Sequence, residues 1–291
     1  MPERGAPLRL AAAIACVSTG APFARWAAPC PPLAIATLRV GIASLLLFAA
    51  GRKEIAKLAA LPKRDRLLVL ASGVLLGVHF GSWIASLSFT STAASVALVA
   101  TNPIFAAIFG TFLGDRVARR EVVGIAIAGG GCAVLAGGDW SAGGDALIGD
   151  GLALIGAASA AGYLVVGRRL RESVPLLPYL GSVNLIAASG LCIAAIVHGD
   201  LGAIPPHAYA ASAGAALVAS FAGHSMLNAA VRVTPTHLVA LAILGEPIGS
   251  SLITWIAFGE QPPLHAVGGG AIVLAGIALG FIAPKRALDR E

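Results

Sequence analysis

Charged residues are scarce in this chain. Asp, Glu, Lys and Arg together make up 12% of its 291 residues, whereas about 25% is usual for a soluble domain. Apolar residues account for 57% of the sequence, and the mean hydropathy is +0.86. A water-soluble fold of this size could not bury so much apolar surface. The composition therefore predicts a polytopic membrane protein.

Sequence motifs for catalysis and for metal binding are missing as well. The four cysteines, Cys16, Cys30, Cys132 and Cys192, have no metal-ligand spacing, and three of them fall inside apolar stretches, as small core residues do. The sequence contains no HExxH or GxSxG motif, and its glycine runs lack the lysine of a phosphate-binding loop. We expect no enzymatic activity, no cofactor and no bound metal.

Long apolar stretches are abundant. A membrane-spanning helix needs about 17–25 residues, and ten stretches of the chain meet this length. They are Leu10–Ala28, Ala34–Ala50, Leu67–Phe89, Ala94–Leu113, Val122–Gly138, Ile148–Gly167, Pro178–Val197, Tyr209–Ala230, His237–Phe258 and Val267–Ala283. The links between them are short, which is typical of antiparallel neighbours. The sequence thus predicts an all-α membrane protein with ten transmembrane helices.

The distribution of Lys and Arg over the loops predicts the orientation. If the N-terminus lies inside, the inner segments hold 18 of the 20 basic residues and the outer loops hold none. Because cytoplasmic loops carry the excess of Lys and Arg, we expect both termini on the cytoplasmic side of an inner membrane. The net charge of +6 lies in short inner loops, which argues against binding of nucleic acid. Of the two remaining basic residues, Arg25 lies near the outer end of its stretch and can snorkel to the interface.

The first apolar stretch also has features of a signal peptide. Leu8–Ala28 has a basic flank, an apolar run and small residues. Arg25 interrupts the region where cleavage would occur, so we expect the segment to be retained.

A repeat of about half the chain length is visible. Pro103 and Pro247 are 144 residues apart, and Gly124 and Gly268 keep the same offset. Asp115 and Glu260, each close to a glycine at a helix end, correspond with a slip of one residue.

Each copy of this repeat contains five predicted helices. Since five is an odd number, the second copy enters the membrane inverted, an architecture that recurs among transporters with substrate sites near the midplane. We predict two inverted five-helix repeats, residues 1–138 and 148–291, joined by an outer linker at 139–147.

Each proline follows a polar residue deep within an apolar stretch. Glu246 lies ten residues after Thr236, and Asn102 lies ten residues after Thr92. At 1.5 Å per residue both are about 15 Å into the membrane, where an acidic side chain costs about 2.5–3.5 kcal/mol or more. We expect Glu246 to be a proton-titrating carboxylate at a central site, or else a packing acid held by a neighbouring hydroxyl or Arg. We expect Asn102 to cap the proline break or to bond across helices, or else to contact substrate.

Further polar residues lie within the predicted spans. Arg39 needs a partner, either a backbone carbonyl freed by a proline or Glu246. His79 and His224 are 145 residues apart and form either a proton relay or a pair of hydrogen-bonded packing groups. Trp83 offers a stacking surface for substrate or else lies at the outer interface, and Tyr163 and Asn228 are further polar candidates within the spans.

Several stretches resemble one known family when they are read in order. They include VSTGAPFARW, LAIATLRVGIASLLL, ASLSFTSTAASVALVATNPIFAAIFGTFLGD, GDGLALIGAASAAGYLVVGRRL and LVALAILGEPIGSSLITWIAFGE. This set resembles the drug/metabolite transporter superfamily, in particular its EamA-like ten-helix exporters, over about residues 8–283. The resemblance implies an inner-membrane carrier of small metabolites such as amino acids, amines or drugs. Asp115 stands where the family usually has Glu, and Thr19-Gly20 lacks the common Trp before the Gly. Both departures leave the expected fold intact but loosen any transfer of substrate.

The sequence predicts a secondary transporter that exports a small metabolite by alternating access, with proton coupling as a further hypothesis. Its partners are then the substrate, protons and the lipid bilayer, and it is a monomer or a homodimer. One alternative is an antiporter of phosphorylated sugars or nucleotide-sugars, which would need several cations in its cavity. Another is a membrane partner protein that transports nothing.

Overall fold

The computed structural model describes residues 6–90, 92–136, 144–171 and 173–282. Within these ranges every regular element is a helix and none is a strand, which confirms the predicted all-α class. Some residues used in the predictions lie outside the described part: Arg4, residues 139–143 of the predicted linker, and the basic residues Lys285, Arg286 and Arg290.

The helices follow one another with short connections. In chain order they are α1 (Ala6–Val17), α2 (Gly20–Trp26), α3 (Pro32–Ala50), η1 (Arg52–Glu54), α4 (Ala56–Ala59), α5 (Lys63–Ser86), α6 (Thr92–Val99), α7 (Asn102–Thr111), α8 (Arg119–Leu135), α9 (Gly144–Leu170), α10 (Leu176–His198), α11 (Pro206–Ala215), η2 (Ala216–His224), α12 (Ser225–Ala230), α13 (Thr236–Ile243), α14 (Glu246–Phe258) and α15 (Leu264–Phe281).

Eight helical segments in the described part are long and apolar enough to cross a membrane. They are Pro32–Ala50, Lys63–Ser86, Ala94–Thr111, Gly144–Leu170, Leu176–His198, Pro206–Ala230, Thr236–Phe258 and Leu264–Phe281. Each overlaps one of the ten predicted stretches. The other two stretches correspond to α1 with α2, which are separate helices, and to α8, which has 17 residues. The chain is therefore a multi-pass membrane protein, and the count of ten spans stays a prediction.

The prediction of one continuous helix over Leu10–Ala28 is wrong. The helix breaks at Ser18 and Thr19, between α1 and α2. The Ser18 hydroxyl donates to the carbonyl of Ile14 at 2.7 Å, and the Thr19 hydroxyl donates to that of Cys16 at 2.7 Å. Such side-chain bonds to the preceding turn compete with backbone bonds and bend helices.

Both predicted proline breaks are present. The helix that ends at Val99 as α6 restarts at Asn102 as α7, and the helix that ends at Ile243 as α13 restarts at Glu246 as α14. In each case the proline falls in the first turn of the new helix. This position suits proline, because its missing N–H would have no partner there anyway.

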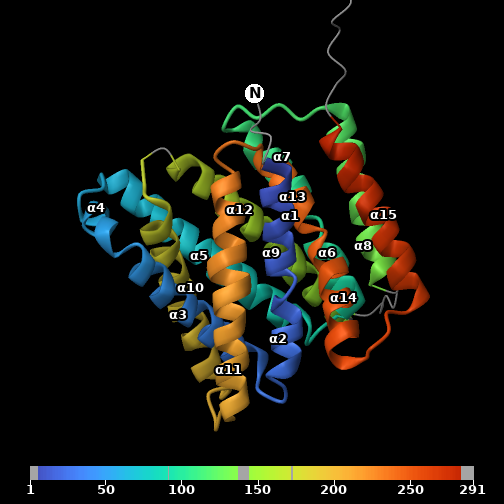
Figure 1. The fold of residues 1–291 in the computed structure, drawn as a ribbon, viewed down its shortest axis with the longest axis horizontal. Helices are drawn as coiled ribbons and strands as arrows, with labels where there is room; N and C mark the ends of the chain where they lie inside the picture. The colour runs from blue at the N-terminus through green and yellow to red at the C-terminus, as the bar shows by residue number, and fades with distance from the viewer. Residues whose placement is uncertain (1–5, 91, 137–143, 172, 283–291) are drawn as a thin grey trace, which may run out of the picture.

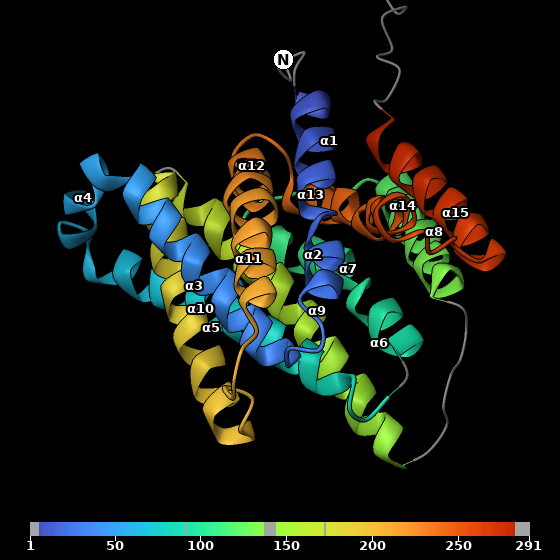
Figure 2. The same ribbon diagram turned by 60° about the horizontal axis from the view of Figure 1, so that its bottom comes forward.

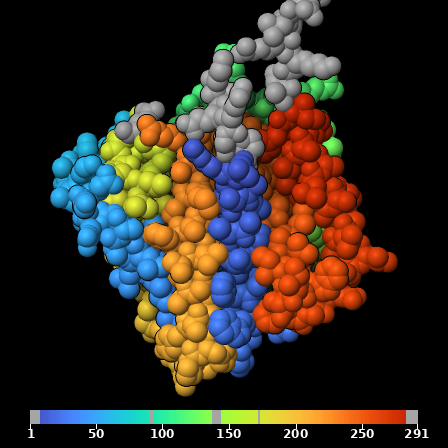
Figure 3. All heavy atoms as spheres, viewed as in Figure 1, coloured from blue at the N-terminus to red at the C-terminus, as the bar shows by residue number. Residues whose placement is uncertain are grey.

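The helices form a bundle with a separate pair at one side. In Figure 1, α8 and α15 lie side by side at the right, while α3, α5 and α10 lie at the left. Figure 2 shows the same bundle turned by 60°, with α11 and α1 still between these groups. The space-filling view in Figure 3 shows that α1 and α2 lie between α11–α12 and α14 on this face. The first helices of the chain are thus flanked by helices from its second part.

Helices α8 and α15 meet backbone to backbone through glycines. A Cβ atom built on Gly131 would lie 2.6 Å from the backbone nitrogen of Val273, and one on Gly124 would lie 2.7 Å from the carbonyl oxygen of Gly276. Gly131 also faces Gly269, so contacts advance along α8 as they retreat along α15. The two helices are therefore antiparallel, and small residues allow the close approach that stabilises helix pairs in lipid.

Substituting one of these glycines should destabilise the protein. We expect Gly131→Ala to lower the melting temperature in detergent by several degrees, because overpacking typically costs about 1–3 kcal/mol. The matched control is the adjacent Gly130→Ala, whose Cβ would have no neighbouring atom within 4 Å. This control should leave the melting temperature unchanged or slightly raised. Equal melting temperatures for both variants would contradict the glycine contact.

Candidate functional site

The break between α1 and α2 packs directly against the break between α13 and α14. The Ser18 hydroxyl lies 3.2 Å from the backbone oxygen of Glu246, and the Ser250 hydroxyl donates to the backbone oxygen of Ser18 at 2.8 Å. Gly249 permits this approach, because a Cβ there would collide with the Ser18 side chain. Backbone groups that lose a helical partner must find another within the protein when lipid surrounds it. The Ser250 hydroxyl therefore satisfies a carbonyl at the first break, which Pro22 leaves without a helical N–H partner.

The guanidinium of Arg39, on α3, contacts two side chains of η2. Its Nε donates to the hydroxyl of Ser220 at 2.9 Å, and a terminal nitrogen lies 3.4 Å from Nε2 of His224. The guanidinium also lies 6.0 Å from the centre of the Phe80 ring, within reach of a cation–π contact. On the opposite side it abuts α2, since a Cβ on Gly20 would lie 3.1 Å from it. Arg39 thus joins helices from distant parts of the chain.

The helical segment that carries both partners of Arg39 is unusual. Ser220 and His224 lie in η2, a π-helix that continues α11 and leads into α12. Wide π-turns in membrane and soluble helices occur frequently at functional sites. Here the π-helix η2 ends at His224, whose ring lies near the guanidinium of Arg39.

Glu246 and His79 complete what we call the central cluster, made of Arg39, His79, Ser220, His224 and Glu246. Glu246 begins α14, and its carboxylate interacts electrostatically with Arg39. A helix N-terminus favours a negative charge. His79 and His224 interact electrostatically with Arg39 and with each other. Nδ1 of His79 lies 2.9 Å from the carbonyl oxygen of Gly156, so this nitrogen carries the hydrogen and donates it.

The candidates from the sequence divide into three groups. Arg39, His79, His224 and Glu246 come together in the central cluster, and Trp83 stacks on the His79 ring at 6.4 Å with 9° between the planes. The indole Nε1 of Trp83 is buried, with no hydrogen-bond partner in the described part of the chain.

The second group is the pair of Tyr163 and Asn228. The Asn228 amide donates to the Tyr163 hydroxyl at 2.7 Å and to the backbone oxygen of His224 at 2.9 Å. Both side chains are buried. Through the bond from Asn228 to its backbone oxygen, the pair therefore helps to fix the helical turn that carries His224.

Asn102 forms the third group. Its side-chain oxygen is buried and has no hydrogen-bond partner among the described residues. Pro103 beside it is buried in the first turn of α7, as Pro247 lies in the first turn of α14. The described hydrogen bonds and ion pairs do not join Asn102 to Glu246.

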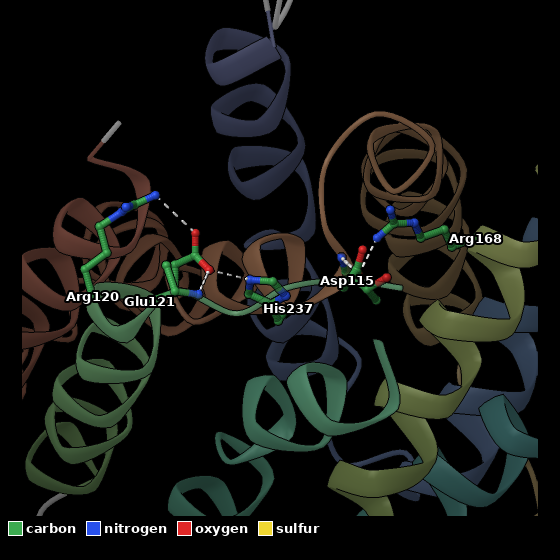
Figure 4. Close-up of polar contacts among 7 residues, drawn as sticks. Asp115, Arg120, Glu121, Arg168 and His237 are labelled. Atoms are coloured by element: carbon green, nitrogen blue, oxygen red, sulfur yellow. Dashed lines mark hydrogen bonds and ion pairs between the residues drawn. The ribbon is translucent and has the colours of Figure 1, made fainter. Parts of the chain in front are cut away.

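A second polar cluster, which the sequence did not reveal, holds the start of α13. Figure 4 shows its two carboxylates. Asp115, which follows α7, accepts a short hydrogen bond from Arg168 at the end of α9 and a second one, at 3.4 Å, from the backbone N–H of Thr236. Glu121, in the first turn of α8, lies 3.1 Å from Nε2 of His237.

The two acids of this cluster have further partners. Glu121 also accepts from the backbone N–H of Ala118 at 2.7 Å and forms an ion pair with Arg120 at 3.4 Å. His237 is fully buried, and Glu121 is 7% exposed. Removing one partner of a buried ion pair typically costs about 3–5 kcal/mol. Glu121 lies three residues after Ala118 at the start of α8, where a Glu side chain commonly caps the helix. This is the one local signal for the cluster in the sequence.

A simpler ion pair joins α2 to the loop that follows α14. The terminal nitrogen of Arg25 lies 2.6 Å from a carboxylate oxygen of Glu260, and these side chains are 57% and 47% exposed. Such an exposed pair contributes about 0–1 kcal/mol. Arg25 therefore has a specific partner in addition to the snorkelling that its position suggested.

An apolar groove lies beside the break in the first helices. It has a volume of about 360 Å³ and runs between α2 and α14. Its lining residues are Thr19, Pro22, Phe23, Trp26, Ile253, Ala257 and Phe258.

Comparison with known proteins identifies the family. The sequence profile of the EamA-like transporter family matches residues 5–137 and again residues 147–282. The chain belongs to the EamA-like transporter family, and members of this family are transporters rather than enzymes. This confirms the resemblance found in the sequence and the prediction of a membrane protein of the transporter class.

The fold is also found among solved structures. One crystal structure of a protein matches 95% of this chain over 96% of its own, with a TM-score of 0.83 and 20% identity. At this identity the likeness shows the fold alone. No curated protein matches the chain.

The contact between the two breaks gives a direct test. We expect Ser250→Ala to lower the melting temperature in detergent, because removing one hydroxyl leaves the Ser18 carbonyl without its partner, a loss of about 1–3 kcal/mol. Ser251→Ala is the matched control, since the Ser251 hydroxyl donates only within α14, to Pro247 at 2.8 Å. A loss as large for Ser251→Ala as for Ser250→Ala would argue against the contact between breaks.

Proposed function

We propose that the protein is a secondary transporter that exports a small, amphiphilic metabolite across the inner membrane by alternating access. Membership of a transporter family supports the class. The apolar groove between α2 and α14 supports an amphiphilic ligand, because it gives an apolar surface next to the break in the first helices. In this proposal the substrate binds at the central cluster.

The central cluster is the observation on which the proposal rests. Arg39 and His79 come from the first matched segment, whereas Ser220, His224 and Glu246 come from the second. Ionisable side chains within membrane-spanning segments are costly, and they typically face a bundle interior and mark substrate or proton pathways. A cluster built by both segments can change its exposure when the segments move relative to each other.

We assign roles to the residues of this region from their chemistry. Glu246 binds a proton or a substrate amine, and Arg39 supplies the opposite charge. The indole N–H of Trp83 is free to donate to the substrate, and the ring nitrogens of His79 and His224 carry protons or hydrogen bonds. One guanidinium facing one carboxylate suits a ligand with both charges better than a phosphorylated sugar, which would need several cations.

The proposed architecture is a pair of inverted five-helix repeats with ten spans, residues 1–138 and 148–291, with both termini cytoplasmic. Two matches to the same family profile and the antiparallel packing of α8 and α15 support it. Pro103 and Pro247 act as points of bending. Asn102, Tyr163 and Asn228 position the helices around the site, and Asn102 has a free oxygen that a substrate can reach on rearrangement.

Proton coupling through Glu246 is the part of the proposal that flux measurements test directly. The purified protein is reconstituted in liposomes, and uptake of amino acids, primary amines and cationic drugs is measured with and without an imposed pH gradient. We expect saturable flux of at least one compound and, for one-to-one exchange with protons, accumulation of about tenfold per pH unit. Glu246→Gln should remove the response to the gradient, because an amide does not bind a proton in this range.

The control for this experiment is Glu54→Gln. Glu54 forms an exposed ion pair with Lys57 on a short loop, and its substitution should leave flux and gradient response intact. Flux that ignores the pH gradient and survives Glu246→Gln would remove proton coupling. Uptake of phosphorylated sugars alone would favour the antiporter, and absence of saturable flux for every compound would favour the non-transporting partner protein.

A further inference from the structure

Two ion pairs of the structure are related by the repeat in the sequence. Arg168 follows Arg25 by 143 residues, and Glu260 follows Asp115 by 145. Both spacings are within one residue of the offset between Pro103 and Pro247. In the structure Arg25 pairs with Glu260 and Arg168 pairs with Asp115. Each pair therefore joins a base from one matched segment to an acid from the other, with the two roles exchanged.

The two ion pairs lie at opposite ends of the bundle. Figure 1 shows the ends of α2 and α14, which carry Arg25 and lead to Glu260, at the bottom, and the start of α13 with α7 at the top. Asp115 lies at the second end, where it bonds the first residue of α13. Because the two pairs lie at opposite ends, the first matched segment can move against the second so that one ion pair breaks while the other stays formed.

The two ion pairs are held unequally. The side chains of Arg25 and Glu260 are 57% and 47% exposed, whereas those of Arg168 and Asp115 are 25% and 6% exposed. Asp115 also accepts from the backbone of Thr236, and the neighbouring contact of Glu121 with His237 holds the next residue of α13 (Figure 4). The Asp115–Arg168 pair is thus largely buried and has a second buried contact beside it, whereas the Arg25–Glu260 pair is exposed.

We propose that these two ion pairs are the closing contacts of the transporter's two faces, and that their inequality sets its resting state. The Asp115–Arg168 pair keeps its end closed in the resting protein. The Arg25–Glu260 pair is the weaker contact and opens first. This inference rests on the alternating-access motion of the proposed function, but it concerns an equilibrium that exists without substrate.

Distances between spin labels measure both ends independently. In a background with the four cysteines replaced by alanine, one labelled pair is Arg116→Cys with Arg232→Cys, at the Asp115 end. The other is Ala28→Cys with Gln261→Cys, at the Glu260 end. All four positions are exposed and each pair spans the two segments. The protein is measured in liposomes without any substrate.

We expect Asp115→Asn and Arg168→Gln each to raise the ratio of open to closed conformers at the Asp115 end by about tenfold, as loss of a partly buried pair allows. Asp115→Glu keeps the carboxylate and is the matched control, which should leave the distances as in the parent. The double variant Asp115→Asn with Arg168→Gln should open this end no further than either single variant, because both remove the same contact.

Arg25→Gln should shift the other end by less than about fivefold, because its ion pair is exposed. Unchanged distances at the Asp115 end in both Asp115→Asn and Arg168→Gln would overturn the inference, as would an equal shift in Asp115→Glu. A larger shift from Arg25→Gln than from Asp115→Asn would overturn the proposed inequality. Flux assays distinguish failure of the proposed function from failure of this inference. Shifted label distances without any flux contradict the proposed function alone. Flux with unshifted label distances contradicts this inference alone.

Discussion

The structure depends on one constraint, that a helix broken inside lipid must satisfy its freed backbone groups within the protein. Two breaks do so by meeting each other, at Ser18 in the first helices and at Glu246 in the ninth predicted span. Their contact holds the start of α14, which carries Glu246, against the first helices.

The buried side chain of Arg39, like the freed backbone groups, must find its polar partners within the protein. A charge at the centre of a bilayer costs several kcal/mol unless it finds partners. Arg39 has a hydroxyl and an imidazole on η2, an aromatic face at Phe80, and space beside α2 that exists because residue 20 is glycine. These partners come from three separate helices, η2, α5 and α2, so the charge holds together the helices that surround it.

Much of the fold could be predicted from composition and periodicity, because spans and proline breaks are local features. Eight spans and both proline breaks followed from the sequence, whereas the partners of Arg39 on η2 did not, since the sequence offered a freed backbone carbonyl or Glu246 instead. The break at Ser18 did not, because serine and threonine are ordinary in apolar helices and their bonding to the preceding turn leaves no pattern. The pairing of Glu121 with His237 is also invisible, since it joins residues 116 positions apart. Likewise, nothing in the letters around Ser220 distinguishes a π-helix from an α-helix.

The glycine contacts between α8 and α15 have a mechanical consequence. Where side chains interlock, a small rotamer change can absorb sliding, but here backbone atoms touch backbone atoms over two turns or more. The two helices therefore have little room to slide against each other at this contact. If the protein transports by the proposed alternating access, the rearrangement must then be taken up mainly by helices outside this pair.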